Sequence, residues 1–184
     1  MSANSWLAPP LIYRDQANRS AYQILRVAAV NHAAFEWIHH EHVGRECGLT
    51  TAQLYVIRDT ATPLPPASGI LSALQTSALM FADASTRNVK VGKEITDALL
   101  NHLKSWVGLN PDSGNVEETV ENLLVEAAAV TAAYNMVSRF LISLDVACMS
   151  DNDVPWPVDR KEVRFMATTS FEIANCTAAF YYHP

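Results

Sequence analysis

The sequence of 184 residues predicts an all-α fold, and two observations support this prediction. Apolar residues recur at helical spacing in successive segments, and residues that commonly begin or end helices separate those segments. The sequence contains no internal repeat, low-complexity tract or heptad run, so we expect a helical bundle. The chain is long enough to bury a core without disulfide bonds or a structural metal ion.

The expected helices follow one another along the chain. After an irregular, proline-containing start, the first helix is expected from about residue 18 to 31. The second follows almost at once and ends near Gly48, a residue type typical of helix C-termini. Thr50 or Thr51 is a natural N-cap for a short third helix. The remaining helices are expected at 70–86, 93–106 and 116–144, with loops at 62–69, 88–92 and 108–115.

The helix expected at 116–144 is the longest. It contains no glycine or proline and carries apolar residues almost all round, so we expect it to lie centrally. A break at SDNDVPWPVDR, residues 150–160, follows it. We expect residues 1–150 to form one helical domain. Residues 151–184 are expected to form a C-terminal extension that packs on this domain or on a neighbouring subunit.

Composition and charge exclude several classes of function. The formal net charge is −6 and no cluster of lysine and arginine occurs, which argues against a nucleic-acid partner. No apolar run reaches the roughly 18 residues that cross a membrane. The start of the sequence, MSANSWLAPPLIYRDQ, lacks the features of a signal peptide. We therefore expect a cytoplasmic protein without a membrane partner.

A cluster of titratable side chains marks the second expected helix. His32, Glu36, His39 and His40 lie within nine positions, at spacings that place side chains near one another on a helix. Imidazole changes its charge near neutral pH, so such a cluster is a candidate acid–base site. Glu36 and His40 stand one turn apart, and pairing of a buried carboxylate with an imidazole favours the charged form of both. The alternative is an ordinary Glu–His pair on a helix surface.

The neighbouring residues are open to more than one interpretation. His39 and His40 are adjacent and point about 100° apart, so one is expected to face the pocket and the other an interface. His32 lies one turn before Glu36 and either joins the site or caps the helix junction. Trp37 is expected in the core or in the pocket wall. The pattern HxxxExxHH is not the HExxH metal motif, so a metal site is the less favoured alternative.

Polar residues interrupt the apolar sequence of the longest helix. Tyr134 and Ser138 lie one turn apart, as do Asn135 and Arg139. Tyr134, Asn135 and Arg139 are candidate substrate-binding residues, because an amide or a guanidinium group can hold a carboxylate or carbonyl oxygen. The alternative is a structural hydrogen bond or ion pair between helices. Arg26 is open to the same two interpretations.

Four ordered blocks resemble the carboxymuconolactone decarboxylase family: ILRVAA, FEWIHHEHVGRECGLT, ALMFADAST and AAAVTAAYNMVSRFLISLDV. The resemblance covers roughly residues 18–148. It implies the all-helical fold that this family shares with its AhpD-like peroxidase relatives. It also implies assembly into a trimer or hexamer, with a dimer as a further option. The family's active site is built around the helix with an EWxxH-like motif, which corresponds to residues 36–40 here.

The sequence departs from this family at functional positions. The thiol-peroxidase branch has a CxxC pair on this helix and a relay glutamate on the preceding one. Those positions hold Ala33, Glu36 and Ala21 here, and only the relay histidine, His40, remains. Disulfide exchange needs a thiolate, so a thiol-dependent peroxidase is disfavoured. The segment before ILRVAA is also shorter than is usual in this branch.

The three cysteines, Cys47, Cys148 and Cys176, are odd in number and far apart. We expect reduced, partly buried thiols, and a redox protein that uses Cys47 or Cys148 is the disfavoured alternative.

The resemblance implies a cofactor-independent, non-redox acid–base enzyme. It would decarboxylate, rearrange or cyclise a small oxygenated metabolite, such as a lactone or a compound derived from a polyketide or an aromatic ring. Glu36 would act as base or electrostatic partner, and His40 would protonate the carbon left when carbon dioxide departs, with His39 beside it. No GxGxxG or P-loop motif is present, in keeping with the expected absence of a cofactor. The alternative is a non-catalytic oligomeric protein that binds a metabolite or serves as a subunit.

Overall fold

The computed structural model describes residues 11–64, 69–109 and 116–159. These residues form α1 (Leu11–Val30), α2 (Ala34–Glu46), α3 (Thr51–Arg58), α4 (Ala73–Asn88), α5 (Lys93–Gly108), α6 (Val116–Ser143) and the short 3-10 turn η2 (Val146–Cys148). The described part of the chain contains no strand, which confirms the all-α prediction.

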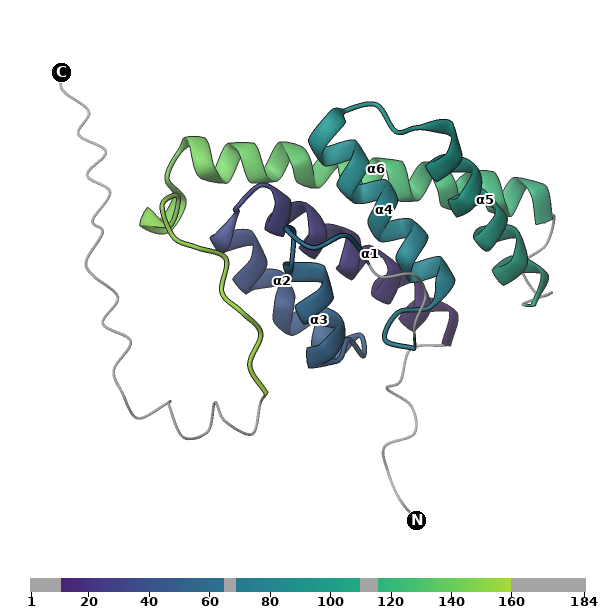
Figure 1. Ribbon diagram of the computed structural model, residues 1–184, viewed down its shortest axis with the longest axis horizontal. Helices are drawn as coiled ribbons and strands as arrows, with labels where there is room; N and C mark the ends of the chain where they lie inside the picture. Colours follow the sequence, from purple (N-terminus) through teal and green to yellow (C-terminus); the bar gives the residue numbers. More distant parts are fainter. Residues whose placement is uncertain (1–10, 65–68, 110–115, 160–184) are drawn as a thin grey trace, which may run out of the picture.

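Helix α1 is the centre of the bundle. It contacts α2, α3, α4 and α6, while α5 packs between α4 and α6. Figure 1 shows α6 running along one side of the molecule, with α1 next to it and α2 and α3 beyond α1. The order of these layers places one face of α2 against the C-terminal half of α6, where the candidate site lies.

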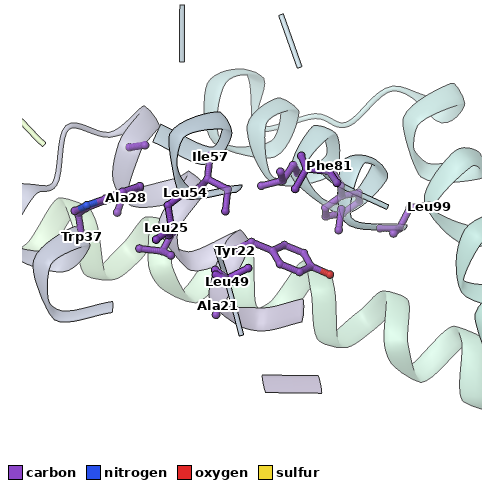
Figure 2. Close-up of a cluster of buried hydrophobic side chains, with 14 of the residues drawn as sticks. Ala21, Tyr22, Leu25, Ala28, Trp37, Leu49, Leu54, Ile57, Phe81 and Leu99 are labelled. Carbon is purple, nitrogen blue, oxygen red and sulfur yellow. The ribbon is translucent and has the colours of Figure 1, made fainter. Parts of the chain in front are cut away.

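The hydrophobic core fills the space between α1 and the helices around it. Figure 2 shows Trp37 at one end of this cluster and Leu99 at the other, with Tyr22 and Leu25 of α1 between them. All four side chains are almost completely buried. Full burial of one large apolar side chain contributes roughly 1.5–3 kcal/mol, so this cluster is the main source of stability.

The ends of α2 and α3 follow from their local sequence. Gly48 has a φ of +101°, and its N–H donates to the Arg45 carbonyl at 3.0 Å, while the Leu49 N–H donates to the Gly44 carbonyl at 2.9 Å. These two bonds form a Schellman motif, which confirms the helix end expected near Gly48. The Thr50 hydroxyl then caps α3.

Two expectations about the helices were wrong. The start of the chain was expected to be irregular up to residue 18, but α1 begins at Leu11. Residues 11–17 contain no glycine or proline, and the prolines just before them are favourable at a helix start. The longest helix, α6, was expected to lie centrally. Only one side of α6 packs on the bundle, and Val125, Met136 and Phe140 on the other side are 66%, 67% and 60% exposed.

The segment 149–159, after η2, runs back beside α2 and α3 (Figure 1). Val154 is buried, and its carbonyl oxygen accepts hydrogen bonds from Arg58 Nε at 3.1 Å and Nη2 at 2.8 Å. The Trp156 ring stacks on Tyr55 and lies 4.2 Å from the Arg58 guanidinium carbon. This segment therefore holds α3 to the end of the bundle.

The domain division expected at residues 150 and 151 stays a prediction. The first part of the expected extension, 151–159, packs on the helical bundle, and the rest lies outside the described residues. No helix in the described part of the chain is long and apolar enough to cross a membrane.

Candidate acid–base site

Helix α2 directs Glu36 into the contact between α2 and α6. The side chain is buried, with 2% of the residue exposed. Its Oε2 accepts a hydrogen bond from the Ser138 hydroxyl of α6 at 2.8 Å. The second oxygen, Oε1, is buried and has no hydrogen-bond partner among the described residues. Buried polar atoms are nearly always paired in native proteins, so an unpartnered carboxyl oxygen is a feature that needs an explanation.

Two aromatic rings lie one helical turn away from the Glu36–Ser138 pair, one on α2 and one on α6. His40 is one helical turn beyond Glu36, and its ring meets the Tyr134 ring edge to face, with centroids 5.0 Å apart. Both residues are partly exposed. Burial raises the pKa of Tyr134, and the negative charge of Glu36 raises it further. The structure thus brings Glu36, His40, Tyr134 and Ser138 together from α2 and α6.

The expected ion pair between Glu36 and His40 is wrong. Pairing would lower the pKa of the carboxyl group and raise that of the imidazole, but both shifts have the opposite sign. Burial raises the pKa of Glu36 to about 7, and the hydrogen bond from Ser138 only partly opposes this shift. Burial lowers the pKa of His40, as do the neighbouring charges of His39 and His42. The physical reason is that Glu36 has a neutral partner, whereas His40 has like-charged neighbours.

A pKa of about 7 for Glu36 makes this group suited to proton transfer. At neutral pH the carboxyl group is present in both its protonated and its ionised form. It can therefore donate a proton in one step and accept one in the next. His40, whose pKa is lowered, is mostly neutral at pH 7 and offers a basic nitrogen or a hydrogen-bond donor.

Two of the predicted site residues lie outside the buried cluster. The His39 side chain is exposed and packs on Phe35, with ring centroids 4.2 Å apart. His32 is exposed and occupies the junction between α1 and α2 with a φ of +57°. Its carbonyl oxygen accepts a hydrogen bond from the Ala34 N–H at 3.1 Å. The position of His32 corresponds to the expected alternative, a residue at the helix junction.

Trp37 lies in the core. Its side chain is fully buried, and Figure 2 shows it among the residues packed around α1. The indole Nε1 donates to Glu41 Oε2 at 3.2 Å. This position agrees with the expectation of a core residue.

Asn135 is buried and joins three helices. Its Nδ2 donates to the Thr86 hydroxyl of α4 and to the Thr131 carbonyl of α6, both at 3.0 Å. Its Oδ1 accepts a hydrogen bond from Asn31 Nδ2, just after α1, at 3.1 Å. The amide is fully used in these bonds, so the geometry supports the structural interpretation of Asn135.

Arg139 is exposed on α6. Its Nη1 donates to the carbonyl oxygen of Asn135, one turn earlier on the same helix, at 3.0 Å. The structure places Arg139 on the solvent side of α6, whereas Ser138 is fully buried on the other side.

Ser138 is the residue of this cluster that the sequence analysis did not select for the site. The available signal was its position one turn after Tyr134, on a helix that is otherwise mostly apolar. A hydroxyl on the packed face of such a helix requires a partner, and α2 provides it through Glu36.

Arg26 has a structural role. Its guanidinium group contacts Asp83 through Nε at 2.8 Å and Nη2 at 2.6 Å, and Nη1 donates to the carbonyl oxygens of Ile57 and Asp59 at 3.0 and 2.7 Å. Burial lowers the pKa of Arg26, and the charge of Asp83 opposes this shift. These bonds tie the C-terminal end of α3 to α1 and α4.

A cleft of about 450 Å³ lies next to this ion pair, away from Glu36. Its lining includes the charged residues Arg26, Asp83 and Arg87, the segment around Thr60, and the apolar residue Ile95. Arg87 is partly exposed and forms an ion pair with Asp83 at 2.9 Å. The cleft therefore contains two guanidinium groups and a single carboxylate.

The described residues were also compared with the expectations for a metal site and for the cysteines. No three His, Cys, Asp or Glu side chains in this part of the chain are placed to hold a metal ion together. Cys47 is not part of a disulfide bond, in agreement with the expected reduced thiol. Cys148 is disulfide-bonded, so the expectation of a reduced thiol was wrong at this position.

The chain has no match among models of protein families, curated proteins or solved structures.

Proposed function

We propose that the protein is a cofactor-independent acid–base enzyme that acts on a small oxygenated substrate at Glu36, His40, Tyr134 and Ser138. The observation that carries the proposal is the state of the Glu36 carboxyl group. It is buried, one of its oxygens has no partner, and its pKa is about 7. Strongly shifted pKa values of this kind are concentrated at functional sites.

The proposed reaction is a decarboxylation or a related lactone rearrangement or cyclisation. When carbon dioxide leaves a β-keto or vinylogous acid, the electrons of the broken C–C bond form an enolate. Protonated Glu36 delivers its proton to the enolate carbon and becomes a carboxylate, which the Ser138 hydroxyl stabilises. Neutral His40 orients a substrate oxygen. After the product leaves, the Glu36 carboxylate takes a proton from solvent and is ready for the next turnover. This assignment exchanges the roles that the sequence analysis expected for the two residues.

Access to Glu36 involves the pair of rings formed by His40 and Tyr134. Glu36 and Ser138 are buried, while the two rings are partly exposed. In the proposed reaction, a substrate reaches Oε1 by displacing these rings. Their return over the bound substrate would exclude water and strengthen the electrostatic interactions in the site.

The family resemblance supports the same reaction class. Glu36 and His40 fall in the block FEWIHHEHVGRECGLT, and Tyr134 and Ser138 fall in the block AAAVTAAYNMVSRFLISLDV. Two of the four blocks that resemble carboxymuconolactone decarboxylases therefore meet at the site. The AhpD-like form of the bundle and its assembly into an oligomer (a trimer or hexamer, with a dimer as a further option) belong to this proposal.

Turnover of γ-carboxymuconolactone and of simple β-keto acids, measured by release of carbon dioxide, tests the proposed function. We expect kcat/KM for a converted substrate to change with an inflection near pH 7. The Glu36→Gln variant should lose roughly two orders of magnitude or more in kcat, because general acid–base catalysis contributes about 100- to 10,000-fold. The matched control is Glu46→Gln, an exposed carboxylate on the same helix, which should leave kcat unchanged.

Two outcomes contradict the proposal. In the first, Glu36→Gln converts the substrate as fast as the unchanged protein does. In the second, alkylation of all cysteines abolishes turnover while Glu36→Gln remains active, which would favour the thiol-based alternative.

The cleft beside Arg26 favours a second candidate function, metabolite binding without catalysis. The two guanidinium groups there outnumber the carboxylate, so a small carboxylic acid could pair with Arg87. Calorimetry with a set of mono- and dicarboxylic acids tests this candidate. It predicts binding that Arg87→Ala abolishes and Glu36→Gln does not change, and absence of binding by every acid in the set contradicts it.

A further inference from the structure

The outward face of α6 carries a continuous stripe of apolar side chains. Val125, Ala129, Ala132, Met136 and Phe140 follow one another at intervals of three or four residues, so they share one face of the helix. We call these five residues the α6 stripe. All five are exposed, and the three large ones are at least 60% exposed. Single exposed apolar residues are common, but a contiguous set on one helix is typical of an interaction surface.

The sizes of the side chains along the stripe suit a second copy of the same helix. Ala129 and Ala132 lie in the middle, where small residues allow two helices to approach closely. Met136 and Phe140 lie towards the C-terminal end, and the smaller Val125 lies towards the N-terminal end. In an antiparallel pair, the large end of one stripe therefore meets the smaller end of the other.

Two charged residues border the stripe in a way that fits the same arrangement. Glu121 and Arg139 are both exposed, and they are 18 residues apart, which is about five helical turns. They consequently lie along the same edge of α6. An antiparallel pair that crosses between Ala129 and Ala132 brings Glu121 close to Arg139 of the partner subunit, and the two-fold axis repeats this pair at the other end. In a parallel pair these charges stay about 27 Å apart along the helix axis.

We propose that the α6 stripe is the interface of a two-fold symmetric homodimer in which the α6 helices of two copies pack antiparallel. The interface has an apolar centre between Ala129 and Ala132 and a Glu121–Arg139 ion pair at each end. This surface is separate from the buried face of α6 that holds Ser138, so the dimer does not depend on the proposed enzymatic function.

Sedimentation equilibrium of the full chain over a hundredfold range of concentration tests the proposal. We expect a dimer, and we expect Met136→Glu and Ala132→Glu to raise the dissociation constant at least a hundredfold while circular dichroism shows unchanged helix content. Val89→Glu is the matched control, because Val89 is apolar and 83% exposed but lies outside α6, and it should leave the dimer intact.

Charge reversal tests the antiparallel arrangement. Glu121→Arg and Arg139→Glu should each weaken the dimer about tenfold, and the double variant should restore it. A monomer at every concentration overturns the proposal, as does a dimer that Met136→Glu and Ala132→Glu leave unchanged. Failure of the double variant to restore binding overturns the antiparallel pairing.

Discussion

Two buried ionisable groups in this protein have opposite surroundings. Arg26, in the contact between α1, α3 and α4, has a carboxylate partner and backbone carbonyl partners for its guanidinium group. Glu36, in the contact between α2 and α6, has a single neutral hydroxyl partner and an oxygen without a partner. Both side chains are at most 2–3% exposed.

The difference in hydrogen-bond and charge partners assigns a structural role to Arg26 and a candidate functional role to Glu36. A buried charge that is fully paired stabilises a particular packing of helices and has little reason to change its charge. A buried carboxyl group without a charged partner has a raised pKa, because burial disfavours the ionised form, so Glu36 titrates near pH 7. The same comparison assigns Asn135, whose amide is fully hydrogen-bonded, to the structural group.

The largest expected effect follows from removing the partner of Arg26. Asp83→Ala leaves a buried guanidinium group without its carboxylate, so we expect the free energy of unfolding to fall by about 3–5 kcal/mol in urea titrations. The matched control is Asp97→Ala, which breaks the exposed Lys93–Asp97 pair and should change stability by less than about 1 kcal/mol. Equal effects of the two variants would mean that Arg26 does not depend on Asp83.

The second prediction concerns the effect of pH on stability. The pKa of Glu36 is raised from an ordinary 4.5 to about 7 in the folded protein. Glu36 therefore favours the folded state fully below about pH 4.5, and this contribution is lost as the pH rises through 7. A shift of this size corresponds to about 3 kcal/mol. Relative to Glu36→Gln, the unchanged protein should lose roughly 2–3 kcal/mol of stability between pH 5 and pH 8.

The quantity to measure is the difference in unfolding free energy between the unchanged protein and Glu36→Gln. The unchanged protein alone does not suffice, because His40 changes stability with pH in the direction opposite to Glu36. The pKa of His40 is lowered, so its contribution to stability is present above its ordinary value and is lost as the pH falls. A difference in unfolding free energy that stays constant from pH 5 to pH 8 contradicts the raised pKa of Glu36.

A smaller effect is expected at Asn135. Asn135→Ala removes the bonds to Thr86 and Asn31 and leaves their buried or half-buried polar groups without this partner, so we expect a loss of about 2 kcal/mol. Asn122→Ala, an exposed asparagine on the same helix, should stay within about 0.5 kcal/mol. If Asn135→Ala matches this control, the amide network does not stabilise the bundle.

Local sequence signals predicted much of the fold. The end of α2 at Gly48 and the N-cap of α3 at Thr50 are determined by neighbouring residues, so they were visible in the sequence. The exposed face of α6 was not predicted, because the residues of a helix do not show how many neighbours will cover it. Phe140 and Leu99 look alike in the sequence, yet one is exposed and the other is buried.

The candidate site was only partly predictable, because the sequence does not show which helices will pack against α2. The one-turn spacing of Glu36 and His40 was readable, but the charge state of each depends on partners from α6 that are about a hundred residues away. The two neighbours that the spacing on α2 indicates do lie at the candidate site, but the interaction expected between them is wrong. Ser138 could be recognised as the partner of Glu36 only once the two helices had been packed together.

Titration of the Glu36 carboxyl carbon by ¹³C NMR, assigned by its absence in Glu36→Gln, tests the central claim most directly. The account predicts a midpoint near pH 7 and a higher midpoint in Ser138→Ala, because the Ser138 hydroxyl lowers the pKa of Glu36. A midpoint near the ordinary value of 4.5, unchanged in Ser138→Ala, would contradict the account.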